Sequence, residues 1–276
     1  MNTINTLISN STSRYTTAFE NGLTPQSLQE HTPAAFAPTA DESLSPAYRF
    51  ISTRRVLDAL GQAGFIPVAA RQTRTRAHNA LHACHCIRLR RKFETVALAD
   101  GVPELIFLNS HDGSSTYQLH MAVFRPICTN GLCVAATQFP VWRISHRRDV
   151  LDEIIKAALE MTESFALLGE RIQCMERTLL DEAQRLEFAD GALKLRFPQP
   201  PHRGIAASQL LEVRRPEDVG TDLWHTFNAV QENCIRGGLA GRSTTGRKTR
   251  SRGITAIRED VRLNAGLWDL AEHYLH

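Results

Sequence analysis

The most concentrated charge in the chain lies in the stretch 236–253, RGGLAGRSTTGRKTRSRG. This stretch holds six cationic side chains, five glycines and no acidic residue. The whole chain has a formal charge of +3, so the remainder without these six charges is at −3. Arginine binds phosphate through a two-point fork, and glycine lets backbone amides approach a ligand closely. We therefore predict a nucleic-acid-binding surface made by Arg236, Arg242, Arg247, Lys248, Arg250 and Arg252.

The alternative for this basic stretch is a solvated surface loop that binds nothing. It is not the phosphate-binding loop of nucleotide-binding proteins, because that motif places glycine before its lysine and here Lys248 follows Arg247. Concentrated positive charge favours a phosphate backbone as the partner. The stretch has no aromatic residue for stacking on bases, so we expect little sequence preference from it.

A second set of polar residues lies at a predicted turn, where Ser110, His111 and Asp112 are consecutive between Asn109 and Gly113. These residue types are those of a catalytic triad. Neighbours on a strand point to opposite faces, however, so they cannot form a relay with histidine between the other two. Two interpretations remain: a polar hairpin tip, or a cluster of side chains and turn amides that grips an anion or a partner.

The segment 78–92, HNALHACHCIRLRRK, contains side chains that could bind a metal ion. Strand alternation divides them between two faces, and zinc sites usually take paired ligands from turns or helices. We therefore predict no cofactor and keep a metal ion as the less favoured alternative. The potential ligands that this argument sets aside are His78, His82, Cys84, His85 and Cys86.

On the same segment, Arg88 and Arg90 share a strand face with Cys84 and Cys86. This spacing predicts a basic strand face that contributes to nucleic-acid binding. Its alternative is an ordinary solvent-facing strand. A different class of function also stays open, an enzyme or nuclease-like protein that uses a metal ion. Its candidate residues are His85, His111, Asp112 and His146.

The elements that must position these residues begin with three apolar runs between Leu105 and Ala136. The runs are separated by Asp112-Gly113 and Asn130-Gly131, which supply the positive φ angles of tight hairpin turns. This pattern predicts an antiparallel meander of at least three strands. A strand at 65–70 and another at 141–146 are expected to flank it.

Helical periodicity surrounds the predicted sheet. The patterns predict helices over 53–60, 149–187, 221–235 and 261–274, with Thr53 as the N-cap of the first. The 149–187 helix is expected to pack across the sheet or onto a second copy, so a homo-oligomer is one expectation. The stretch 188–216 contains four prolines and is interpreted mainly as a connector.

The predicted fold class is α+β, with one antiparallel sheet of four to six strands, a long helix across one face and C-terminal helices. Three parts are expected: a flexible arm over 1–45 with a short helix near 26–30, a core domain over 46–187, and the part 188–276 that carries the basic stretch. The predicted core consists of Leu57, Leu60, Ile87, Leu89, Leu105, Phe107, Val123, Phe165, Leu168 and Trp268.

Composition limits the function classes further. The chain of 276 residues is 42% hydrophobic and 22% charged, which is ordinary for a globular protein. No apolar run approaches the ~20 residues of a membrane span, and the N-terminus lacks the pattern of a signal peptide. The six cysteines form no C-x-x-C pair and are interpreted as buried reduced thiols. We expect a cytoplasmic protein without a membrane partner.

Several short motifs spread from residue 45 to the C-terminus carry a resemblance to a known family. These motifs are Ser45-x-x-Tyr48-x-x-Ile51-x-Thr53, His85-x-x-Arg88-x-Arg90, Asn109-Ser110-His111-Asp112-Gly113-Ser114, Phe124-Arg125-Pro126-Ile127-Cys128-Thr129-Asn130-Gly131, Arg143-Ile144-Ser145-His146, Trp224…Asn228-x-x-Gln231-Glu232-Asn233…Arg236-Gly237-Gly238 and Leu263-Asn264-x-x-Leu267-Trp268. With these motifs the sequence resembles the phage- and plasmid-encoded proteins that share domain of unknown function 932, which also occur in cryptic prophages. Pro126 departs from the family, in which an aliphatic residue is expected.

The resemblance implies a protein of mobile genetic elements and brings no established activity. A helix, an antiparallel meander and a long helix also follow one another in the core of Rad52-like single-strand annealing proteins. This similarity of element order is a fold-level analogy. It implies a non-catalytic protein that binds single-stranded DNA and acts in annealing or recombination.

Overall fold

The computed structural model describes most of the chain. Its described residues are 16–17, 22–75, 80–96, 98, 101–126, 131–133, 139, 141–146, 150–198, 204–243 and 245–275. His78 and Asn130, which were candidates for a metal ligand and a turn residue, lie outside these ranges.

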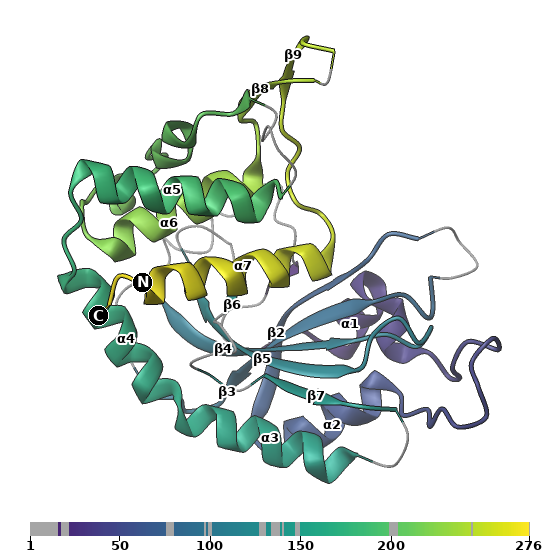
Figure 1. Cartoon of the computed structure of the whole chain (residues 1–276). Helices are drawn as coiled ribbons and strands as arrows, with labels where there is room; N and C mark the ends of the chain where they lie inside the picture. The colour runs from purple at the N-terminus through teal and green to yellow at the C-terminus, as the bar shows by residue number, and fades with distance from the viewer. Residues whose placement is uncertain are drawn as a thin grey trace.

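An antiparallel sheet forms the centre of the molecule (Figure 1). Its strands run in the order β1-β2-β3-β4-β5-β6, and β7 also pairs with β5. The predicted α+β fold and antiparallel meander are confirmed. The four long strands are β2 (Phe65–Gln72), β3 (His85–Arg91), β4 (Val102–Asn109) and β5 (Tyr117–Phe124), and the short ones are β1 (Thr16–Thr17), β6 (Gly131–Cys133) and β7 (Trp142–Ile144).

Pro126 lies just beyond the end of β5 at Phe124. Proline cannot donate a hydrogen bond to a neighbouring strand, so its position after the last paired residue leaves the ladder intact. The departure from the family pattern at this residue therefore does not interrupt β5.

Helices lie on both faces of the sheet (Figure 1). One face meets α2 and α3, and the other meets α7. The α-helices are α1 (Pro25–His31), α2 (Thr53–Gln62), α3 (Leu151–Glu163), α4 (Phe165–Arg177), α5 (Glu182–Arg196), α6 (Leu223–Arg236) and α7 (Ile257–Glu272). Short 3-10 turns are η1 (Pro33–Phe36), η4 (Ala207–Leu211) and η5 (Pro216–Asp218).

The single helix predicted over 149–187 is wrong, because the chain breaks it twice. Ser164 ends α3 and begins α4, and α4 ends at Arg177. After α4 the backbone is hydrogen-bonded to the segment that precedes α6: Leu180 N–H donates to Thr221 O, and Leu223 N–H donates to Thr178 O. A tertiary contact therefore overrides the helical periodicity, and α5 begins within the predicted helix and ends in the predicted connector.

Part of the stretch predicted as an N-terminal arm packs against the body of the protein. The short helix predicted near 26–30 is confirmed as α1. Leu28 and Ala35 are buried and belong to the same apolar core as the sheet. The predicted core residues are buried apart from Leu57, which is half-buried. Cys84, Cys86 and Cys234 are buried free thiols, whereas Cys174 is exposed.

No helix among the described residues is long and apolar enough to cross a membrane.

Candidate nucleic-acid interface and buried polar clusters

The basic stretch 236–253 forms a β-hairpin rather than an open loop. Strands β8 (Ala240–Arg242) and β9 (Lys248–Arg250) pair antiparallel, with Arg242 opposite Lys248 and Ala240 opposite Arg250. Residues two apart on a strand point to the same face, so Arg242, Lys248 and Arg250 share one face of the hairpin. The opposite face carries the small residues Gly241 and Thr249.

The hairpin projects from the body of the protein next to α5 and α6 (Figure 1). Its β9 residues are exposed, and so are Arg247 and Arg252. In the described part of the chain, Arg236 forms an ion pair, at 2.7 Å from Glu232, and the other five cations of the stretch form none. The guanidinium groups of Arg242 and Arg250 donate to carbonyl oxygens of the stretch itself. The structure thus leaves most of the predicted charge uncompensated.

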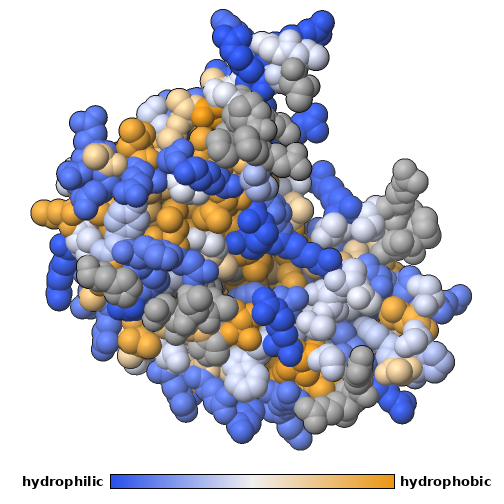
Figure 2. Space-filling view, viewed as in Figure 1, coloured by the Kyte–Doolittle hydropathy of each residue, from blue (hydrophilic) through white to orange (hydrophobic). Residues whose placement is uncertain are grey.

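A recess of about 550 Å³ lies against the hairpin. The space-filling view shows hydrophilic side chains on the projecting hairpin and a hollowed surface below it (Figure 2). Exposed cations beside a recess with glycine backbone in its wall suit an anionic ligand. The lining residues are Gly204, Ala240, Gly241, Arg242, Lys248, Thr249 and Arg250.

The base of the hairpin is fixed by close backbone contacts. Gly237 has φ +70°, and a Cβ atom there would lie 2.7 Å from the backbone carbonyl carbon of Arg252. Ser251 bonds with both Gly238 and Leu239, and Ile254 N–H donates to Ile235 O. Only glycine fits at position 237, which explains the glycine after α6 in physical terms.

The predicted basic strand face is wrong, because that face of the sheet is buried. Arg88 is 1% exposed, its Nε lies 2.6 Å from Glu104 Oε2, and its guanidinium stacks 3.8 Å from the centroid of the Phe124 ring. Arg90 is mostly buried and bonds to the other Glu104 oxygen at 2.7 Å. Helix α7 covers the face near Cys86 through Ile257. Strand alternation correctly placed Arg88 and Arg90 on one face. The single acidic residue of the apolar strand β4, Glu104, was the overlooked indication that this face holds a buried ion pair.

Two of the candidate histidines meet in a buried cluster around Thr53. His85 Nδ1 lies 2.9 Å from Ala83 O and must donate to it, so His85 Nε2 accepts the Thr53 hydroxyl hydrogen at 2.7 Å. Thr53 Oγ1 in turn accepts from Asn109 Nδ2 at 3.0 Å and lies 3.4 Å from His111 Nε2. Thr53 is therefore a bridge between strands rather than the predicted N-cap, a role that Ser52 takes.

The other candidates of the enzyme hypothesis surround this cluster. His146 stacks on Tyr48 with the ring centroids 4.6 Å apart, and the tilted ring of Tyr117 lies 3.9 Å away on centroid distance. Asp112 lies at the turn, where its Oδ1 accepts from Ser114 N–H. Ser110 Oγ accepts from Ser115 N–H, and Gly113 has φ +73°. The turn is thus held by its own side chains, and the described residues contain no group of three acidic, histidine or cysteine side chains arranged to hold a metal ion.

Burial sets the charge state of these histidines. Desolvation lowers the pKa of His85 and of His146 to about 4, and lowers that of His111, which also faces three other histidines, to about 2. Partial burial raises the pKa of Asp112, but hydrogen bonds from Ser114 and Ser110 outweigh it and bring that pKa below its usual value. The three rings are therefore neutral. Both nitrogens of His85 are hydrogen-bonded, whereas His111 Nδ1 and both nitrogens of His146 have no hydrogen-bond partner among the described residues.

Comparison with known proteins identifies the family of this chain. Residues 41–268 match the family described as Domain of unknown function (DUF932). The chain belongs to this family. Two relatives from Escherichia coli (strain K12), the UPF0380 proteins YfjQ and YafZ, are each 39% identical to it over 254 residues, which cover 92% of this chain and 92% of each relative. No solved structure matches the chain.

The DUF932 motifs found in the sequence lie against one another in space. Tyr48 stacks on His146, Thr53 bonds His85, and Gln231 Nε2 donates to Asn264 Oδ1 at 2.6 Å. These contacts join the segment before α2 to the sheet edge, and α6 to α7. Many polar residues of the DUF932 motifs therefore make internal contacts.

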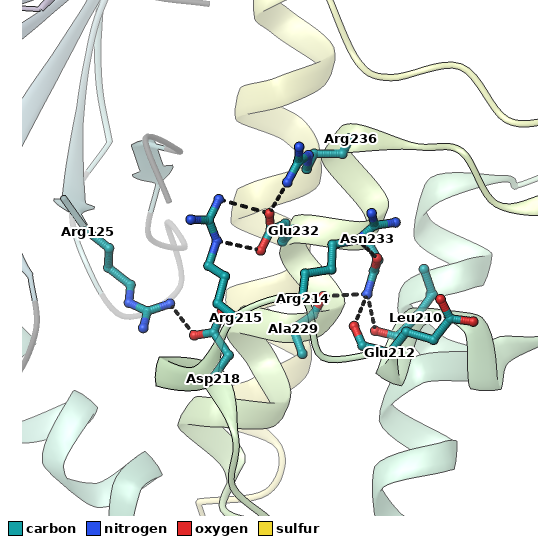
Figure 3. Close-up of polar contacts among 10 residues, drawn as sticks. All are labelled: Arg125, Leu210, Glu212, Arg214, Arg215, Asp218, Ala229, Glu232, Asn233 and Arg236. Atoms are coloured by element: carbon teal, nitrogen blue, oxygen red, sulfur yellow. Dashed lines mark hydrogen bonds and ion pairs between the residues drawn. The ribbon is translucent and has the colours of Figure 1, made fainter. Parts of the chain in front are cut away.

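Sequence reasoning missed the polar network at the end of α6, which Figure 3 shows. Glu232, 2% exposed, receives a two-point bond from Arg215 as well as the bond from Arg236. Asn233 Oδ1 accepts from Arg214 at 2.5 Å. Arg125 donates to Asp218 at 2.8 Å, a buried pair that links the end of β5 to η5. The sequence did contain a signal for this network. Buried helices usually carry apolar side chains at their buried positions, and α6 has polar residues there.

Lowering the pH from about 7 to about 5 is expected to destabilise the protein. His85, His120 and His146 have pKa values of about 4 when folded, against 6.5 for an ordinary histidine. Below 6.5 the unfolded chain binds protons that the folded chain does not, so stability is full above that value and falls toward pH 4. Each group contributes a slope of at most about 1.4 kcal/mol per pH unit.

Urea unfolding at both pH values measures this effect. His120→Gln should reduce the slope, because it removes a buried ring whose pKa is about 4 in the folded protein. A free energy of unfolding that is equal at both pH values would contradict the assignment of neutral buried histidines.

Proposed function

We propose that this DUF932 protein is a non-catalytic, cytoplasmic nucleic-acid-binding protein that contacts the phosphate backbone through the hairpin 236–253. The observation that carries the proposal is the exposed face with Arg242, Lys248 and Arg250, which forms no ion pair among the described residues. Arg247 and Arg252 extend the same charge. In a chain that is otherwise net negative, such a surface concentrates attraction for phosphate at one place.

The expected target is single-stranded DNA, and the expected role is annealing or recombination in a mobile genetic element. Both follow from the family resemblance and from the Rad52-like order of elements. Binding by charge alone tolerates any sequence, as annealing requires. The alternative of a metal-dependent enzyme has less support, because His85, one of its four candidate residues, has both ring nitrogens bonded to Ala83 and Thr53.

Fluorescence anisotropy with a labelled single-stranded oligonucleotide tests the proposal. The logarithm of the affinity should fall linearly with the logarithm of salt concentration, by about 0.7 for each phosphate contact on a single strand. A duplex and an RNA of the same length identify the preferred target. Gel filtration with and without the oligonucleotide gives the oligomeric state of each form.

Two results would overturn the proposal. Absence of binding at low salt would leave the hairpin as a solvated surface. Binding that does not change with salt would show that phosphate neutralisation by these cations is not its basis.

A further inference from the structure

A two-stranded hairpin needs external support to keep one orientation. Such a hairpin is marginally stable by itself in water. Its cations can be arranged in advance of binding only if its strands are fixed to the body. Side chains of η4 and α5 supply this support.

Gln209 of η4 occupies the outer edge of β8. Its Oε1 accepts from Ala240 N–H at 2.7 Å, and its Nε2 donates to Ala240 O at 2.9 Å. These are the two hydrogen bonds that a residue of a third strand would exchange with Ala240. The glutamine amide thus takes the place of a neighbouring strand at Ala240 of β8.

Arg196 at the end of α5 fixes the other side of the hairpin. Its Nη2 donates to Arg252 O at 2.9 Å, and its Nε donates to Cys234 O at 3.1 Å. Gln209 therefore holds strand β8 itself, and Arg196 holds the backbone two residues beyond the end of β9. Of these two side chains, the glutamine is uncharged, so its removal does not change the electrostatic field.

We propose that Gln209 is a positioning residue that fixes the hairpin 236–253 in the orientation that binds nucleic acid. This inference rests on the proposed function. Gln209 need not touch the ligand. Without its amide, the edge of β8 exchanges these bonds for bonds to water, and the cationic face samples several orientations. Part of the binding free energy is then consumed in ordering the hairpin.

Gln209→Ala is expected to weaken binding of a single-stranded oligonucleotide roughly three- to tenfold, the effect of losing one or two modest hydrogen bonds. Because no charge is lost, the slope of affinity against salt should stay that of the wild type. Amide hydrogen exchange at Ala240 should accelerate, since its N–H loses its acceptor. Gln209→Met, similar in length but unable to form these bonds, should behave like the alanine variant, and Gln173→Ala on α4 serves as the matched control.

Three outcomes overturn the inference. One is unchanged affinity together with faster exchange at Ala240, because the hairpin would then move without consequence. Another is a reduced salt slope in Gln209→Ala, which a change in phosphate contacts would cause. The third is unchanged exchange at Ala240. If the wild-type protein itself binds no oligonucleotide, the proposed function fails, and hydrogen exchange still shows whether Gln209 orders the hairpin.

Discussion

Replacing Arg247, Lys248, Arg250 and Arg252 with alanine is expected to remove most of the affinity for nucleic acid at moderate salt. These side chains are exposed and form no ion pair with a described acid. If all four contact phosphate, their loss reduces the salt slope by about 3, at roughly 0.7 per contact on a single strand. The fold should be unaffected, because substitutions at exposed positions rarely change stability by more than about 0.5 kcal/mol.

A matched variant separates a local contact from total charge. Replacing Arg54, Lys92, Lys156 and Arg177 with alanine also removes four exposed cations, but from α2, the end of β3, α3 and the end of α4. If the hairpin is the interface, this control keeps most of the affinity and of the salt slope. Equal losses in the two variants would show that net charge matters and position does not. Unchanged binding in the hairpin variant would assign the interface to another surface.

The sheet could be predicted from the sequence because its turns and strand faces depend on neighbouring residues in the chain. Asp112-Gly113 fixes one tight turn, and Leu105 to Leu108 alternate between two buried faces, as the paired register of β4 and β5 confirms. The position of the basic stretch could be predicted, but its β-hairpin conformation could not, because its five glycines indicated a flexible loop. Its hairpin depends on Gly237 and on the bonds of Ala240 with Gln209, a residue that lies 31 positions away.

Long-range contacts were beyond the reach of periodicity. The helix predicted over 149–187 breaks because residues near 180 pair with residues near 222. Arg88 was predicted to face solvent because alternation gives the face of a side chain and not what covers that face. Helix α7, about 170 positions further along the chain, supplies the cover. The clusters of His85 with Thr53 and of Gln231 with Asn264 likewise join segments that no local pattern relates.

Glu104→Gln is expected to be among the most destabilising single substitutions in the sheet. Glu104 is fully buried and accepts from Arg88 at 2.6 Å and from Arg90 at 2.7 Å. Without its charge, the guanidinium of Arg88 loses this ion pair while it stays buried against Phe124. Removing one partner of a buried ion pair typically costs about 3–5 kcal/mol, because desolvation of the remaining charge is no longer offset.

Urea unfolding of Glu104→Gln measures this loss, and two further variants show its cause. Glu160→Gln breaks the exposed pair with Lys156 and should change the free energy of unfolding by less than about 1 kcal/mol. The double substitution Arg88→Met with Glu104→Leu removes the two fully buried charges and leaves Arg90, whose side chain is 18% exposed, with access to water. It should therefore recover part of the stability. Wild-type stability of Glu104→Gln would show that the buried guanidinium of Arg88 does not need the charge of Glu104.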